Sequence, residues 1–378
     1  MLHLSGAWLA RAPARTFFIA LAVGSSLSVV LLLEGFQSGL YAQMENVVLR
    51  READLFVVQA GVGNFLASRS KLPQTSRRQV EGVPGVAQVN PLTVVPIIFE
   101  QDGRRSPILL VVHQELGGAD RVVRGVGIER PRDIVIDESL ASLYGLEPGD
   151  PFVIADFEFR VAGIAAGSAA MFTAMAFATY DDLLDFYFSS GVMGDVASLP
   201  LVSFLLVRLA EGADSRDVAT AIEAAVSSAD VFLPEALAAN DVAMGRSLFG
   251  PVMGAVTAVA YGVCLLVIGL VLYVEASARR GSLGVLKALG FRSAQLTAAM
   301  AAEGVGLCVL SLPLALGLAL AIGHAVEAWA PLYTVDVLVP GPLLRSLVAG
   351  LALTLLASLA PVQVLRRLDP ADAFRSLT

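Results

Sequence analysis

The sequence is poor in the residues from which most catalytic and metal sites are built. Its 378 residues include two lysines, two cysteines and three histidines. A nucleotide-binding P-loop needs a lysine followed by serine or threonine, but Lys71 precedes Leu72 and Lys287 precedes Ala288. The histidines lack partners at the spacing of metal ligands; they are His3, His113 and His324. We therefore expect no catalytic residues, no metal and no nucleotide site in this chain.

Charged residues are also scarce. They make up 16% of the chain, against about 25% in soluble domains, while 56% is hydrophobic and the mean hydropathy is +0.71. Four long apolar runs stand out, and roughly 20 such residues cross a bilayer as a helix. They predict transmembrane helices over 16–36, 246–275, 294–325 and 345–365. The two cysteines, Cys264 and Cys308, fall inside these spans, so we expect no disulfide framework.

The first apolar run has an alternative interpretation as a cleaved signal peptide. It follows Arg11 and Arg15, but it ends in Glu34-Gly35-Phe36 rather than in a small-x-small cleavage site. These features favour a retained membrane anchor. Residues 1–15 before it fit either an amphipathic segment at the cytoplasmic membrane surface or a simple extension of the span.

The charges are distributed unevenly and predict an orientation. Residues 37–245 hold 27 acidic and 15 basic residues, while the rest of the chain holds 7 acidic and 11 basic ones. Lys and Arg favour cytoplasmic flanks, so both termini, including 366–378, and the loop 276–293 are expected in the cytoplasm of a bacterial inner membrane. The domain 37–245 and the short loop 326–344 are expected outside. No basic patch suggests a nucleic-acid partner.

The segment 37–245 predicts a mixed domain. A strand, a helix and a strand are expected at each of its ends, which is the pattern of a split βαβ fold: Ala53–Gln59, Gln74–Glu81 and Val86–Phe99, then Ser203–Leu209, Ser215–Ser227 and Val231–Leu233. A β-rich insertion spans about 106–199, with a strand at Asp133–Asp137, a helix at Glu138–Tyr144 and a hairpin over Phe152–Ile164. The expected fold class is therefore an α-helical membrane protein with four transmembrane helices and an extracytoplasmic α+β domain.

The loop between the second and third spans carries the clearest local pattern. Leu283, Leu286 and Leu289 recur every three residues after Arg279 and Arg280. This spacing predicts a short amphipathic helix that Gly290 closes. Its apolar face fits two destinations, either the membrane interface and the protein's own helix ends or a groove on a partner protein.

Four segments resemble one family. The heptapeptide Gly284–Gly290 resembles the coupling-helix signature of the MacB/FtsX-type (type VII) ABC transporter permeases. The tail 361–375, the strand-helix-turn Asp137–Asp150 and the segment Gly35–Tyr41 are similar to other parts of that family, the last to its DevC-like branch. Ser282 departs from the pattern, because the family usually has Glu there.

The resemblance implies a permease subunit that dimerises, binds two copies of a separate ABC ATPase and meets ATP and Mg only through that ATPase. A periplasmic adaptor protein is a possible further partner. The implied cargo is amphipathic, such as a lipid, lipoprotein, glycolipid, haem or drug. The alternative is an FtsX-like regulator of cell-wall hydrolases that transports nothing. The implied coupling residues are Arg279, Arg280, Leu283, Gly284, Val285, Leu286, Lys287, Ala288, Leu289 and Gly290.

Glu303 is the remaining candidate. It lies near the start of the third span, where an acid either faces the bundle interior or reaches the lipid headgroups.

Overall fold

The computed structural model describes residues 13–66, 70–154, 156–189 and 201–359. Contacts divide the chain into two compact units. The bundle unit contains the residues up to Ser38, Gly250–Val326 and those from Val335. The globular unit contains Gly39–Phe249 and Glu327–Thr334. Most of the predicted amphipathic segment 1–15 and the whole C-terminal tail 366–378 lie outside the described residues.

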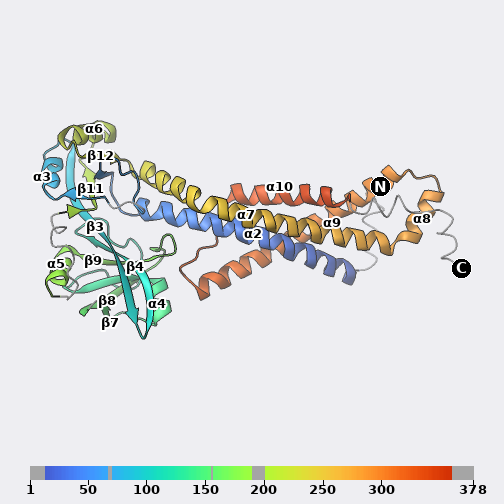
Figure 1. The fold of residues 1–378 in the computed structure, drawn as a ribbon, viewed down its shortest axis with the longest axis horizontal. Helices are drawn as coiled ribbons and strands as arrows, with labels where there is room; N and C mark the ends of the chain where they lie inside the picture. The colour runs from blue at the N-terminus through green and yellow to red at the C-terminus, as the bar shows by residue number, and fades with distance from the viewer. Residues whose placement is uncertain (1–12, 67–69, 155, 190–200, 360–378) are drawn as a thin grey trace. The chain divides into compact units, whose positions relative to one another are not determined.

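The bundle unit is built from long apolar helices (Figure 1). The described residues contain four helices that are long and apolar enough to cross a membrane: α2 (Pro13–Leu49), α7 (Pro234–Ala278), α9 (Ser293–Trp329) and α10 (Pro340–Ala357). α2, α7 and α9 extend past the predicted spans, because hydropathy marks only the membrane-crossing part of a longer helix. α10 instead ends at Ala357, with Ser358 as its C-cap residue, short of the predicted end at 365. α10 begins at Pro340 rather than near 345, since proline fits the first turn of a helix.

The bundle core is formed by side chains from all four helices, including Leu27, Leu272, Leu307 and Ala357. Small residues allow close approach. A Cβ on Gly304 of α9 would lie 3.3 Å from Leu272 of α7 and from Thr354 of α10. Such contacts are common between membrane helices. Cys264 and Cys308 are buried free thiols.

The globular unit confirms the split βαβ pattern. Its first half is β1 (Leu55–Gln59), α3 (Thr75–Glu81) and β3 (Val86–Gln101), and its second half is β11 (Phe204–Leu209), α6 (Ser215–Ala225) and β12 (Ala229–Phe232). These strands pair antiparallel in the order β12-β1-β11-β3. Each βαβ half therefore has a strand of the other half between its own two strands. Val80 of α3 and Ile222 of α6 pack on this sheet.

Two prolines lie inside β3, which is a single strand of 16 residues. β3 pairs with β11 through Val86–Leu92 and with β4 (Arg104–His113) through Leu92–Gln101. Pro91 and Pro96 thus each lie in a part of β3 with one neighbour. A missing N–H is tolerated at such positions.

The insertion continues the same sheet, in the order β4-β9-β6-β8-β5, with β7 paired to β8. The elements are β5 (Val122–Gly125), β6 (Asp133–Asp137), α4 (Glu138–Tyr144), β7 (Pro151–Ile154), β8 (Phe157–Ala165), β9 (Ala174–Thr179) and α5 (Tyr180–Ser189). A separate pair is formed by β2 (Leu72–Pro73) and β10 (Leu201–Val202). The predicted boundary near 106 falls inside β4. The insertion therefore begins within a strand that pairs with β3, and not at a linker.

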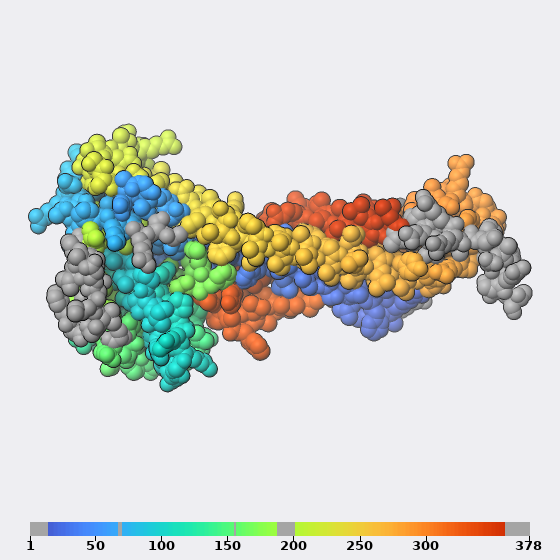
Figure 2. All heavy atoms as spheres, viewed as in Figure 1, coloured from blue at the N-terminus to red at the C-terminus, as the bar shows by residue number. Residues whose placement is uncertain are grey.

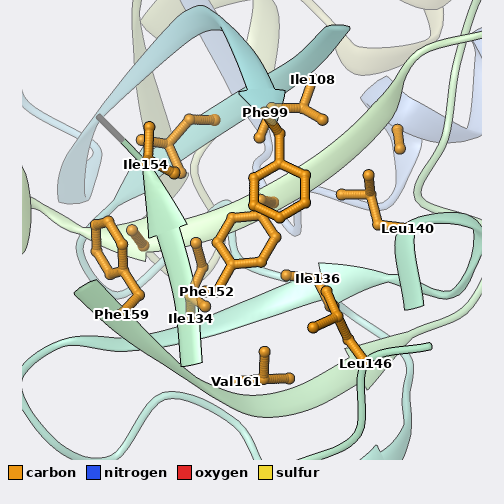
Figure 3. Close-up of a cluster of buried hydrophobic side chains, with 14 of the residues drawn as sticks. Phe99, Ile108, Ile134, Ile136, Leu140, Leu146, Phe152, Ile154, Phe159 and Val161 are labelled. Carbon is orange, nitrogen blue, oxygen red and sulfur yellow. The ribbon is translucent and has the colours of Figure 1, made fainter. Parts of the chain in front are cut away.

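The insertion has its own aromatic core (Figure 3). Phe99 of β3 stacks on Phe152 of β7 with ring centroids 4.1 Å apart. Ile134 and Ile136 of β6 and Leu140 of α4 surround this pair. The β3–β4 hairpin therefore belongs both to the split βαβ sheet and to the insertion.

Candidate functional site at the α7–α8–α9 turn

The predicted short helix forms between α7 and α9 (Figure 1). α8 runs Arg280–Ala288, with Arg279 as its N-cap residue and Leu289 as its C-cap residue. Gly290 has φ +94°, its N–H donates to the Lys287 carbonyl, and the Phe291 N–H donates to the Leu286 carbonyl. These two bonds form a Schellman motif, which needs a left-handed residue at the position of Gly290.

The apolar face of α8 divides between two environments. Leu283 is buried and Leu286 is half-buried against Leu296 and Met300 of α9. Leu289 instead remains 72% exposed. In Figure 2, α8 (orange) stands at the surface of the bundle unit. Two leucines therefore pack on the protein's own helix ends, and the third faces outward.

The other predicted coupling residues follow the same division. Gly284 is buried, and Val285 and Lys287 are half-buried. Ser282, Ala288 and Gly290 are exposed together with Leu289. The outward surface of α8 is therefore smaller than the sequence pattern implies.

The two arginines at the start of α8 point to different surroundings. Arg279 forms an ion pair with Glu275 of α7, and its Nη1 donates to Glu303 Oε1 of α9 at 2.8 Å. Arg280 is exposed and donates to Ser277 Oγ at 3.4 Å. Arg279 therefore belongs to the bundle interior, whereas Arg280 belongs to the surface.

Glu303 is part of a buried charge network. Its side chain is 6% exposed, so it faces the bundle interior. Glu275, with a 5% exposed side chain, also accepts from Arg15 Nη2 of α2 at 2.6 Å. The two buried carboxylates are thus compensated by two guanidinium groups, as buried charges require, although the Arg15 side chain is 46% exposed. We call Arg15, Glu275, Arg279 and Glu303 the charge network.

Sequence reasoning missed Arg15 and Glu275. The i,i+4 spacing of Glu275 and Arg279 was a usable signal for one pair. Nothing local indicates Arg15, which lies 260 residues from Glu275 in the chain.

The globular unit offers a second candidate, a cavity of about 290 Å³ beside Arg51, His113 and Phe177. Arg51 donates to the carbonyls of Val47, Gly117 and Gly118. Burial lowers the pKa of Arg51 to about 10, although Asp120 opposes the shift. Because the Arg51 guanidinium donates to these carbonyls, we interpret Arg51 as a residue that holds the loop 117–118 in place rather than as a ligand-binding residue.

The fold and the site define a multi-pass membrane protein with one globular unit inserted after its first membrane helix. Family models cover most of the chain: residues 16–225 match the MacB-like periplasmic core domain, and residues 254–370 match the FtsX-like permease C-terminal region. The chain therefore belongs to the MacB/FtsX-type ABC transporter permeases.

Curated relatives agree over nearly full length. An uncharacterized ABC transporter permease of Mycobacterium tuberculosis is 25% identical over 364 residues, covering 95% of both chains. One of Mycobacterium bovis is 25% identical over 371 residues with the same coverage.

The solved structures that are similar to this chain each cover about half of it. The periplasmic region of MacB from Actinobacillus actinomycetemcomitans has 12% identity and a TM-score of 0.37, covering 49% of this chain and 90% of that one. The extracellular domain of the transporter YknZ from Gram-positive bacteria has 13% identity and a TM-score of 0.35, covering 48% and 98%.

Proposed function

We propose that this permease works in an ABC export complex, in which a separate ATPase docks on α8 and drives movement of the extracytoplasmic domain. The observation that carries the proposal is the environment of α8. Its base is fixed by Leu283 and Arg279, while Leu289 is exposed at the opposite end. An exposed leucine on a short helix with a packed base suits insertion into a partner's groove.

The complex would contain two copies of the ATPase and a second copy of this permease. ATP and Mg would bind to the ATPase. The arginine-rich flanks favour placing α8 and both termini in the cytoplasm, with the acidic domain outside. A periplasmic adaptor is a further candidate partner.

The proposed cargo is amphipathic, a lipid, lipoprotein, glycolipid, haem or drug taken up outside the cytoplasm. The alternative is FtsX-like regulation of cell-wall hydrolases. The insertion β4–α5 enlarges the extracytoplasmic domain with a second, aromatic core. This size favours export, because the extracytoplasmic domain of FtsX-type relatives is smaller. Efflux assays and peptidoglycan-hydrolase assays on a deletion strain would separate the two functions.

The docking model is tested at Leu289. Leu289→Asp places a charge in the proposed groove and should lower ATPase retention by the purified permease at least tenfold, equivalent to about 1.4 kcal/mol. Leu286 is a poorer target, because it packs inward and its loss would disturb α8 itself.

The matched control is Ser282→Glu, which also adds a negative charge to an exposed position of α8. It introduces the residue usual in the family, so ATPase retention should stay at the wild-type level or rise. Wild-type retention by Leu289→Asp would refute docking through α8.

A further inference from the structure

Arg279 is the residue through which the start of α8 contacts the surrounding helices. Its guanidinium contacts two carboxylates, Glu275 on α7 and Glu303 on α9. Glu275 is in turn bound by Arg15 on α2. One side chain at the N-cap of α8 therefore joins a chain of charges that reaches three membrane helices.

The charge network has a directional geometry that apolar packing lacks. A guanidinium is planar and presents its donors in a fixed fork, so contact with two carboxylates fixes its position from two sides. Separating it from Glu303 would leave that buried carboxylate without the arginine that pairs with it, which is strongly unfavourable, whereas Glu275 would keep its pair with Arg15. Movement of the α8 base should therefore move the helix ends with it.

The apolar contacts of α8 are less restrictive. Leu283 and Leu286 pack among Ala276, Leu296 and Met300. Such contacts are non-directional and can be kept while the helices slide. They hold α8 against the bundle but have no directional preference of their own.

We propose that Arg279 is a positioning residue, which transmits displacement of α8 to α2, α7 and α9 through Glu275 and Glu303. This inference rests on the proposed docking of an ATPase to α8. It assigns two tasks to neighbouring parts of the segment: Leu289 binds the partner, and Arg279 passes on the movement. Loss of Arg279 should therefore separate binding from coupling.

The test uses the full permease–ATPase complex in nanodiscs. Hydrogen–deuterium exchange of the globular unit is measured without nucleotide and with a non-hydrolysable ATP analogue. Wild type should show a nucleotide-dependent change. Arg279→Gln and Glu303→Gln should lose at least four-fifths of that change, while ATPase retention stays within about twofold of wild type, since 0.4 kcal/mol corresponds to about that ratio.

Arg292→Gln is the matched control. It makes the same chemical change at an exposed arginine that lies outside both the charge network and the predicted coupling residues, and it should keep the full response. A full response in Arg279→Gln would refute the role of Arg279. Loss of ATPase retention in Arg279→Gln would also refute it, because Arg279 would then belong to the docking surface.

The double variant Arg279→Gln/Glu303→Gln separates transmission from stability. It removes one positive and one negative charge and leaves the Arg15–Glu275 pair, so it should fold at the wild-type level even if a single variant does not. It should still lack the nucleotide response, and a restored response would refute the proposal. If wild type itself retains no ATPase, the docking proposal fails instead.

Discussion

The two units compensate their buried charges by different means. In the globular unit, buried carboxylates accept hydrogen bonds from backbone N–H groups: Asp133 from Glu129 and Arg130, Asp137 from Ser139 and Ser168, Asp182 from Arg132, and Asp241 from Phe65 and Leu66. Asp133 also pairs with Arg160 at the surface. In the bundle unit, Glu34, Glu275 and Glu303 pair with arginine side chains.

The difference follows from the supply of backbone groups. Loops and helix starts in the globular unit have N–H groups without an internal partner. Inside long membrane-crossing helices, the backbone groups are consumed within the helix. A buried carboxylate there must find an opposite charge. Arg51 shows the same rule for a cation, since it uses backbone carbonyls in the globular unit.

The largest expected effect comes from removing a backbone-bonded carboxylate. Asp137→Ala deletes the N-cap of α4 and leaves the buried Ser168 N–H without its acceptor. A lost cap costs about 1 kcal/mol, and an unsatisfied buried donor costs about 1–3 kcal/mol. We expect the opening free energy of β6 and α4, measured by hydrogen exchange, to fall by about 3 kcal/mol.

Asp137→Asn is the control for this comparison. Its amide oxygen can still accept one of the two backbone bonds, so we expect about half of the loss seen with alanine. Equal losses in both variants would show that ionic charge, rather than backbone hydrogen bonding, stabilises this site.

The bundle should respond asymmetrically when an ion pair is broken. The Glu34 side chain is 7% exposed, whereas that of its partner Arg345 is 63% exposed. Arg345→Gln strands a buried carboxylate and should cost about 2 kcal/mol, below the full cost of a buried pair because water reaches the arginine. Glu34→Gln leaves an arginine that water can solvate and should cost less than about 1 kcal/mol.

Thermal unfolding of the full chain in nanodiscs measures this asymmetry. Both variants remove one charge from the same pair and retain an amide at its position. Equal destabilisation would mean that Glu34 is compensated by something other than Arg345, and the contrast between the units would fail.

The sequence predicted those parts of the fold that depend on neighbouring residues. Asp137 before an amphipathic run and Gly145 after it mark both ends of α4, where Gly145 has φ +67°. β9 was not expected, because it is buried on both faces and shows no alternation of apolar and polar residues. Strand β4 was missed as well, because its pairing with β9 is a long-range contact.

The candidate site shows the same limit. The helix α8 and its closure at Gly290 follow from the adjacent residues Leu283–Gly290. The direction of Arg279 does not, because its partner Glu303 lies 24 residues further along the chain. Whether Leu286 faces inward or outward depends equally on Leu296 and Met300 of another helix. Sequence periodicity shows which residues share one face of a helix, but not which other element that face packs against.

The smallest expected effect lies within the globular unit and separates two neighbouring carboxylates by pH. Burial raises the pKa of Asp137, and hydrogen bonds from Ser139 and Ser168 offset only part of the shift. Burial also acts to raise the pKa of Asp133, but hydrogen bonds from Arg160 and backbone N–H groups outweigh it and leave that pKa below its usual value. The two groups should therefore affect stability in opposite directions as the pH changes.

For Asp137, the folded state binds its proton first as the pH falls. Its contribution to stability therefore grows as the pH falls through the raised folded pKa and is fully present below the unfolded pKa of about 3.9. For Asp133, the contribution is present above about pH 3.9 and is lost as the pH falls through the lower folded pKa. The cost of Asp137→Asn should therefore grow on acidification, while that of Asp133→Asn should shrink, by about 1.4 kcal/mol for each unit of pKa difference. Urea unfolding of both variants between about pH 3 and 7 measures the two slopes. Slopes of the same sign would show that Arg160 does not outweigh burial at Asp133. The pKa values of Asp133 and Asp137 would then shift in the same direction, despite their different hydrogen-bond partners.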